Sequence, residues 1–366
     1  MKKLLFLVMI GAVSILVIGS IVAMKARPTA YQLRTGSRPL TPAVVISASS
    51  GWQTLGGEAG NSACLGLDSD YLGNIYAGTG SGVYRWDLAS TSWSQLSSEN
   101  SRALVYDKTR HVLYSATDTA VKKWDGSAWT QLGDSFTGGN IFSLAVDPSG
   151  NLYVGGTFKG INDVTRGRIA IWYNGTTSWS YIENGSIVGD CCYSIFYSFG
   201  TIYAGGDRGV FAYRSQWAQM KGVPDGKYVT LDHFGNLYAT DGYFIYFWKK
   251  GQLLSTGTFS KVPADYPWGA AYEGNTNIRK IFFGSPNVLY VGGQFNKFSG
   301  NTTTNYAVAK LTGAMLNPAG GDTLLGTCFS LIFSNNYLYA GGEFGGENGG
   351  LFKDKKVNIV RGRNLL

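Results

Sequence analysis

Only two histidines, His111 and His233, are available in this chain of 366 residues for acid–base catalysis or metal binding near neutral pH. Both lie in short polar segments that we interpret as turns, in distant parts of the chain. A Ser-His-Asp triad or a histidine-rich metal site needs histidines placed beside partner side chains, and this spacing does not favour either. We therefore predict turn roles for both histidines, and we expect neither a metal nor another cofactor.

The four cysteines offer a second chemistry, either a disulfide or buried thiols. They are Cys64, Cys191, Cys192 and Cys328, and no Cys-x-x-Cys pair is present to bind zinc. Cys64 and Cys328 would belong to the first and last repeats of a closed ring, so a disulfide between them is one prediction. The alternative is that the cysteines are free and pack as small apolar side chains.

The elements that must position such residues are repeats. Seven related segments recur, of which residues 151–158 (NLYVGGTF) are the fullest copy. Their tyrosines are Tyr76, Tyr114, Tyr153, Tyr203, Tyr238, Tyr290 and Tyr339. The spacing runs from 35 residues (Tyr203 to Tyr238) to 52 residues (Tyr238 to Tyr290), which is typical of repeat architectures.

The third repeat shows the strands most clearly. Residues 141–146, 151–156, 169–174 and 179–182 form four short apolar runs separated by turns. Strands that are apolar almost throughout are typical of sheets buried on both faces, as in four-stranded sheets packed around an axis. We therefore predict an all-β fold, a seven-bladed β-propeller over residues 46–366.

A second signal, tryptophan followed three residues later by an aliphatic residue, marks the fourth strand and predicts how the ring closes. Its first copy, Trp52 to Leu55, precedes the first tyrosine segment and has no repeat of its own. The last repeat, residues 319–366, lacks a fourth strand. We therefore predict that residues 50–56 complete the seventh blade and so close the propeller with an N-terminal strand.

The third repeat resembles a kelch-type blade in Gly155-Gly156, Tyr173 and Trp179. The segment is also similar to kelch-related repeats of bacterial surface proteins. This resemblance implies a propeller that is more often an interaction platform than an enzyme. Kelch-type copper oxidases use histidine and tyrosine ligands, and this chain has no matching histidine.

The N-terminus predicts export. Residues 4–23 carry no charge, and twenty apolar residues are long enough to cross a membrane as a helix. We expect residues 1–23 to be an uncleaved signal-anchor or a cleaved signal peptide, and residues 24–45 to be a basic, proline-containing linker. The propeller would then be periplasmic or extracellular, either anchored to the membrane or secreted if the signal is cleaved.

The net charge of +8 does not indicate nucleic-acid binding, because it is concentrated at the ends. Residues 1–40 carry +6 and residues 353–366 carry +4, which leaves 8 − 10 = −2 for the remainder. A nearly neutral body has no basic surface for a phosphate backbone.

Candidate binding residues lie in the connections after the second and fourth strands, which share one face of a propeller. Long connections on a rigid scaffold are common binding sites. Three residues, Asp207, Gln294 and Glu343, follow the glycines at an equivalent register and could lie near the axis. The binding candidates are Asp163, Arg166, Asp207, Arg208, Trp268, Gln294, Glu343 and Glu347.

The sequence leaves three functions open. We favour an exported, membrane-tethered scaffold that binds another protein through the long-loop face. A carbohydrate-binding propeller is an alternative, because exposed aromatics such as Trp268 stack on sugars. The third is a glycoside hydrolase or lyase that uses a carboxylate pair such as Asp207 and Glu343, which would have to lie roughly 5–10 Å apart. We assign no catalytic residue.

Overall fold

The structure is a computed structural model, and all statements below refer to the residues that it describes. These are residues 52–55, 59–60, 62–161, 164–165, 167–182, 185–254, 256–262, 277–284, 288–295, 306–312, 315–319, 324, 326–344 and 357–362. Within them, no helix combines the length and the hydropathy that a membrane crossing requires. The predicted N-terminal helix (1–23) and linker (24–45) lie outside the described residues.

The described residues form seven four-stranded antiparallel sheets, which belong to one compact unit, Ser50–Leu366. The first four sheets are β2 (Cys64–Ser69), β3 (Ile75–Thr79), β4 (Gly82–Asp87), β5 (Ser92–Ser97); β6 (Ala103–Asp107), β7 (Val112–Ala116), β8 (Val121–Trp124), β9 (Trp129–Gln131); β11 (Ile141–Val146), β12 (Leu152–Gly156), β15 (Ile169–Trp172), β16 (Ser180–Tyr181); and β17 (Cys192–Ser198), β18 (Thr201–Gly206), β19 (Gly209–Tyr213), β20 (Trp217–Met220).

The other three sheets are β21 (Tyr228–Leu231), β22 (Leu237–Thr240), β23 (Ile245–Trp248), β24 (Ser260–Lys261); β25 (Asn277–Gly284), β26 (Val288–Phe295), β27 (Tyr306–Thr312), β28 (Met315–Pro318); and β29 (Gly326–Ser334), β30 (Tyr337–Phe344), β31 (Val357–Gly362), β1 (Trp52–Thr54). A small additional sheet contains β10 (Phe136–Thr137), β13 (Gly160–Ile161) and β14 (Val164–Thr165), and a short 3-10 helix, η1, spans Gly185–Val188.

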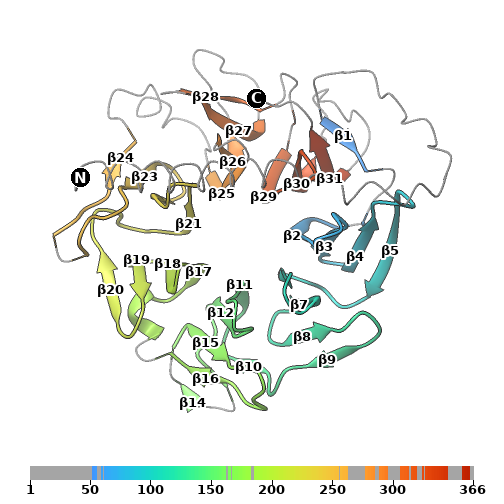
Figure 1. Ribbon diagram of the computed structural model, residues 1–366, viewed down its shortest axis with the longest axis horizontal. Helices are drawn as coiled ribbons and strands as arrows, with labels where there is room; N and C mark the ends of the chain where they lie inside the picture. The colour runs from blue at the N-terminus through green and yellow to red at the C-terminus, as the bar shows by residue number, and fades with distance from the viewer. Residues whose placement is uncertain are drawn as a thin grey trace, which may run out of the picture. The chain divides into compact units, whose positions relative to one another are not determined.

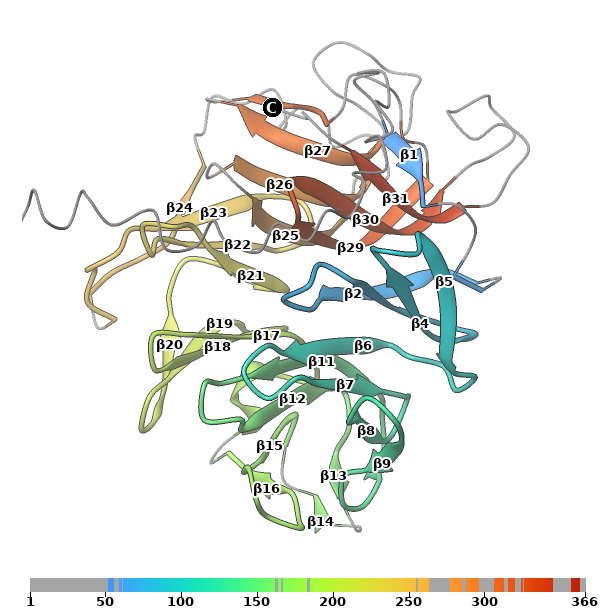
Figure 2. The same cartoon turned by 45° about the vertical axis from the view of Figure 1, so that its right-hand side comes forward.

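The sheets are arranged around a common axis, with the first strand of each sheet innermost (Figure 1). Each first strand contacts the first strand of the next sheet, in the order β2, β6, β11, β17, β21, β25, β29, and β29 contacts β2. The turned view shows the sheets packed face against face (Figure 2). The fold is therefore an all-β propeller, and each of the seven predicted repeats contributes one four-stranded sheet.

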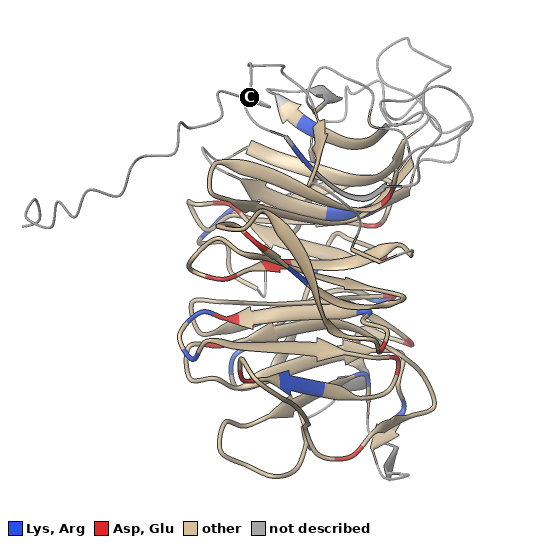
Figure 3. Cartoon of the chain, turned by 90° about the vertical axis from the view of Figure 1, so that its right-hand side faces the viewer, with Lys and Arg blue, Asp and Glu red and all other residues tan. Residues whose placement is uncertain are grey.

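Hydrophobic side chains fill the spaces between sheets, which explains why the strands are apolar almost throughout. Every residue of β3 and of β12 is buried. One of the core clusters combines Leu67 of the first sheet with Tyr339 of the last. Lys, Arg, Asp and Glu lie mostly in turns and near strand ends (Figure 3). Burial on both sheet faces is thus the main source of stability.

The double glycine that ends the second strand has two separate structural roles. A Cβ atom on Gly155 would lie 2.7 Å from Cys192 Sγ in the next sheet. A Cβ atom on Gly156 would lie 2.0 Å from the carbonyl oxygen of Asn140 in its own sheet. The first glycine therefore lets the neighbouring sheet approach, and the second leaves room for the backbone of the first strand.

The second glycine lies opposite a β-bulge in the first strand. In the third sheet the register shifts between Ile141 and Ser143, which leaves Phe142 as the extra residue. Similar shifts occur in β2, β17, β25 and β29. The second and fifth sheets have Ala116-Thr117 and Thr240-Asp241 in place of the glycines, and their first two strands pair without a shift.

The tyrosine of the repeat ties the second strand to the preceding turn. The carboxylate of Asp147 accepts hydrogen bonds from the Asn151 backbone NH (2.9 Å), the Asn151 amide (2.8 Å) and the Tyr153 hydroxyl (3.1 Å). In the first sheet the equivalent groups of Asn74 and Tyr76 donate to Asp70. These carboxylates are therefore used in tight turns.

The seventh sheet is completed by the N-terminal strand, as predicted. β1 pairs with β31, with Trp52 opposite Gly362 and Thr54 opposite Val360, and the two strands lie side by side in Figures 1 and 2. Trp52 packs in the core between the sixth and seventh sheets, whereas Leu55 packs in the core between the seventh and first. This short segment therefore joins both ends of the propeller chain.

The fourth-strand tryptophans join neighbouring sheets. The indole NH of Trp129 donates to the Leu96 carbonyl of the preceding sheet (2.9 Å), and that of Trp179 donates to the Leu132 carbonyl (2.7 Å). The Trp52 indole donates in the same way to the Ala319 carbonyl (2.9 Å). The tryptophan signal of the sequence is therefore part of the contact between sheets.

Candidate functional site

The antiparallel sheets give the propeller two faces. First strands begin and second strands end on the face that carries the long connections, here called the long-loop face. The turns between first and second strands and between third and fourth strands lie on the opposite face, here called the short-turn face. Asp207 and Arg208 occupy the β18–β19 turn of the long-loop face. Gln294 and Glu343 lie near the long-loop ends of β26 and β30.

The other four binding candidates, Asp163, Arg166, Trp268 and Glu347, lie outside the described residues. Of those described, Gln294 is half-buried and pairs with Asn277, whereas Glu343 is exposed and pairs with Thr327. Whether any of them binds a ligand stays a prediction.

A ring of half-buried side chains surrounds the axis at the long-loop end of the first strands. Each sheet contributes one residue at an equivalent position, and in five sheets it is the bulged residue. Bulges commonly redirect a side chain beside a functional site. The members of this inner ring are Leu65, Arg102, Phe142, Tyr193, Lys227, Arg279 and Phe329.

Five sheets contribute to a continuous part of this ring. The rings of Phe142 and Tyr193 are nearly parallel, with centroids 6.5 Å apart, and the Tyr193 and Tyr228 centroids are 6.4 Å apart. The Arg279 guanidinium lies 5.1 Å from the Phe329 centroid. With Lys227 these residues form what we call the aromatic–cationic arc: Phe142, Tyr193, Lys227, Tyr228, Arg279 and Phe329.

The cations of the arc contact aromatic rings rather than carboxylates. Lys227 Nζ lies 6.0 Å from the Tyr193 centroid and 5.9 Å from that of Tyr243. The buried Nε of Arg279 has no hydrogen-bond partner. The ion pairs among the described residues include neither Lys227 nor Arg279 nor the adjacent Lys280. The charges of Lys227 and Arg279 are thus held here without an ion-paired acid among the described residues, whereas Lys280 interacts with the carboxylate of Asp68.

Burial changes the acidity of several groups near the arc. It raises the pKa of Tyr193, and hydrogen bonding to Asp207 adds to the effect. Burial lowers the pKa of Lys280, and the negative charge of Asp68 opposes this shift. Asp207 therefore lies beside the arc, whereas Gln294 and Glu343 pair with residues two positions before Arg279 and Phe329.

The structure does not bring the suggested carboxylate pair together. Asp207 belongs to the fourth sheet and Glu343 to the seventh, so the fifth and sixth sheets stand between them. Among the described residues, no group of three or more His, Cys, Asp or Glu side chains is arranged to hold a metal ion.

The predicted disulfide between Cys64 and Cys328 is wrong, because all four cysteines are free and buried. Cys64 Sγ occupies the space beside Gly341 of the preceding sheet, and Cys328 Sγ occupies the space beside Gly292. The two thiols therefore point the same way around the ring instead of toward each other. Burial raises the pKa of Cys328 to about 12, so the thiol stays protonated at neutral pH.

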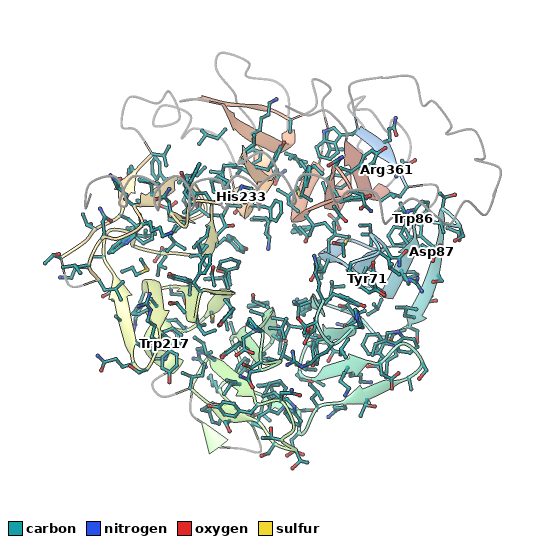
Figure 4. All side chains as sticks on the ribbon, in the orientation of Figure 1. Tyr71, Trp86, Asp87, Trp217, His233 and Arg361 are labelled. Atoms are coloured by element: carbon teal, nitrogen blue, oxygen red, sulfur yellow. The ribbon has the colours of Figure 1, made fainter. Side chains whose placement is uncertain are left out.

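The histidines occupy the turns that the sequence predicted. His111 lies between β6 and β7, and His233 lies between β21 and β22. The His111 ring is 4.6 Å from the ring of Tyr71, and the turns with Tyr71 and His233 lie in different parts of the propeller (Figure 4). The two histidines therefore cannot act on one substrate together.

Sequence analysis missed the arc, although a weak signal for it exists. The pattern Cys/Ile-aromatic-Ser occurs near the start of three first strands, and its aromatic residues are Phe142, Tyr193 and Phe329. It also missed the short-turn face, where large apolar side chains are exposed. Those in its first-to-second strand turns are Tyr71, Leu72, Phe199 and Phe234.

Comparisons with known proteins support the fold and no family. No protein-family model matches the chain, and no curated protein matches it. The extracellular domain of a hybrid two-component system from B. thetaiotaomicron matches with a TM-score of 0.62 and 13% identity, over 86% of this chain and 40% of that one. A second such domain from the same organism has a TM-score of 0.61 with 13% identity, over 85% and 41%.

The WD40 repeats of RRP9 are also similar, with a TM-score of 0.60 and 13% identity over 86% of this chain and 98% of that one. The present chain thus spans about two fifths of the two bacterial extracellular domains and nearly all of the WD40 domain. Identities this low show a common propeller fold. The comparisons do not show membership of the kelch family, which the third repeat resembles.

Proposed function

We propose that this chain is an exported, membrane-tethered propeller of seven blades that binds another protein through its long-loop face. The observation that carries the proposal is the aromatic–cationic arc, where half-buried aromatic rings and cations from five sheets meet on that face. Aromatic residues and arginine are the side chains most enriched in the energetic centres of protein interfaces.

Three further observations support the architecture within this proposal. The seven four-stranded sheets and the closed series of contacts between first strands support the blade number. The double glycines and fourth-strand tryptophans support kelch-like repeats over residues 46–366. The uncharged run at residues 4–23 supports a membrane anchor, followed by a linker at 24–45.

Two structural neighbours support export, because both are extracellular domains of bacterial two-component proteins. The point where the chain enters the propeller also fits a tether. Trp52 begins β1 opposite Gly362, at the short-turn end of the seventh sheet. A tether attached at this point leaves the long-loop face free for a partner.

A carbohydrate-binding function is the second candidate. The nearly parallel rings of Phe142 and Tyr193 could stack on the apolar faces of sugar rings. Asp207 beside Tyr193 could then accept hydrogen bonds from sugar hydroxyls. In that case the partner would be a glycan, and the same long-loop face would bind it.

Photo-crosslinking in the full chain tests the proposal. Benzoylphenylalanine replaces Phe142 in the arc or, as a control, Phe199, which is 87% exposed on the short-turn face. We expect a discrete protein adduct in membranes from the Phe142 position and none of the same size from Phe199. Absence of a protein adduct at Phe142, with binding of the 46–366 fragment to a glycan array, would refute protein binding and favour a lectin.

A further inference from the structure

We infer that the aromatic–cationic arc recognises a partner segment that carries carboxylates next to apolar side chains, that is, an acidic and hydrophobic peptide segment. This inference rests on the proposed function, because it names the chemistry by which a protein partner would be bound. It concerns the cations of the fifth and sixth sheets and the aromatic rings on both sides of them.

The first argument is the charge that the arc leaves unpaired. Lys227 lies just before β21 and Arg279 lies in β25, and neither belongs to an ion pair among the described residues. The buried Nε of Arg279 lacks an acceptor. A charged donor removed from water without an acceptor is destabilising, and an incoming carboxylate would satisfy it.

Two other half-buried arginines have acids of their own, whereas Arg361 lies over an aromatic ring as Arg279 does. Arg85 pairs with Asp87 at 3.0 Å, and Arg168 pairs with Asp190 at 3.2 Å. Asp207, beside the arc, interacts with Tyr193, and Asp68 acts on Lys280. An anion is therefore the ligand that complements the cations of the arc, and a carboxylate matches the planar guanidinium with two oxygens.

The second argument concerns the neutral part of the ligand. Phe142 and Phe329 have no polar atom in their side chains and stand at the two ends of the arc. A sugar presents hydroxyl groups around its ring, and some would lose water against these phenyl rings without gaining a partner. Apolar peptide side chains lose no hydrogen bond in the same place. The arc therefore fits alternating acidic and apolar side chains better than a sugar.

Calorimetric titration of the 46–366 fragment tests this inference. All described strands lie within this fragment, so it contains the whole propeller. The probe is a synthetic peptide of alternating Glu and Leu, compared with the same peptide carrying Gln for Glu. We expect the Glu peptide to bind about tenfold more tightly or better, with an affinity that falls as salt is added.

Two variants locate the binding site. Lys227→Gln and Arg279→Gln should each weaken binding of the Glu peptide about tenfold, because each removes a charged donor. Arg361→Gln is the matched control, and Arg361 is labelled in Figure 4. Its guanidinium also lies over an aromatic ring, 4.7 Å from the Tyr337 centroid, and its Nε also lacks a partner, but it lies outside the arc on β31. Its affinity for the peptide should be unchanged.

Melting temperatures show whether each variant is folded. If Arg279→Gln unfolds, Lys227→Gln decides the test, because Lys227 Nζ lies 6.0 Å and 5.9 Å from the centroids of the Tyr193 and Tyr243 rings and belongs to no ion pair among the described residues. Equal affinity for the Glu and Gln peptides would overturn the inference, and so would binding of polygalacturonate without binding of either peptide. A crosslink at Phe142 without any preference for Glu would leave the proposed function standing and remove only this inference.

Discussion

Removal of the N-terminal strand should open the propeller. The variant lacks residues 46–56, so the seventh sheet loses β1 and the backbone groups of β31 lose their partners. Two core side chains are lost as well, Trp52, which is 4% exposed, and Leu55, which is 1% exposed. Because they pack in two different spaces between sheets, both contacts of the seventh sheet are weakened.

The expected magnitude follows from these losses. Truncation of a buried tryptophan costs about 3–5 kcal/mol, and truncation of a buried leucine costs about 2–5 kcal/mol. The hydrogen bond from the Trp52 indole to the Ala319 carbonyl adds about 1 kcal/mol. The total is about 6–11 kcal/mol, which is comparable with the whole stability of a typical domain, about 5–15 kcal/mol.

Urea denaturation of the 46–366 and 57–366 fragments measures this loss. The shorter fragment should unfold at a much lower urea concentration or fail to fold. A circular permutant that carries residues 46–56 after residue 366 should regain most of the stability, because the strand can again pair with β31. The exposed Thr54 provides a control, since Thr54→Ala removes no buried contact. An unchanged midpoint for 57–366, or a permutant no more stable than 57–366, would refute the closure.

Two further predictions concern contacts between sheets, and two concern the buried cysteines. Trp179→Phe should lower the free energy of unfolding by about 1 kcal/mol, because its indole NH donates to a carbonyl. Trp217→Phe should not have this effect, because the Trp217 Nε1 has no partner. Equal urea midpoints for the two variants would contradict this. Gly341→Ala should destabilise by about 1–3 kcal/mol, since its Cβ would lie 2.6 Å from Cys64 Sγ, and the loss should be smaller in a Cys64→Ala background. The thiols should react with Ellman's reagent only after denaturation, without reductant, and should then number four. Burial raises the pKa of Cys191 from 9.0 to about 12. As pH rises, the thiol therefore deprotonates in the unfolded chain before it does in the folded chain, so the free energy of unfolding should fall above pH 9.0.

The fold could be predicted in large part because each repeat carries the sequence signals of its own strands and turns. Local pairing and burial are visible in the tyrosine of each second strand and in the apolar strands. The position of Trp52 before the first complete repeat was enough to predict that β1 pairs with β31. These features depend on contacts within one sheet or between adjacent sheets, which a periodic sequence makes visible.

The candidate site was harder to predict, because it depends on which residue of a strand is extra. Phe142 and Tyr193 stand in the same apolar runs as their neighbours, and apart from the weak Cys/Ile-aromatic-Ser pattern nothing in the sequence shows that they are bulged. The disulfide prediction failed for a related reason. Cys64 and Cys328 belong to neighbouring sheets, but sheets related by rotation about an axis direct equivalent side chains the same way around the ring.

The double glycine connects the architecture to the site. Its second residue leaves space for a carbonyl of the first strand, as Gly293 does for Asn277, where a Cβ would come within 2.1 Å. That space accompanies the bulge at which Arg279 becomes the extra residue. In the second and fifth sheets, which have neither glycine, there is no bulge, and a residue just before the strand, such as Lys227, belongs to the inner ring instead. The first sheet is bulged although Thr79 stands in place of the second glycine. The glycines do not bind a ligand in this view. They permit the backbone irregularity that brings a different side chain of each sheet to the axis, and so they allow one repeated fold to carry a varied binding surface.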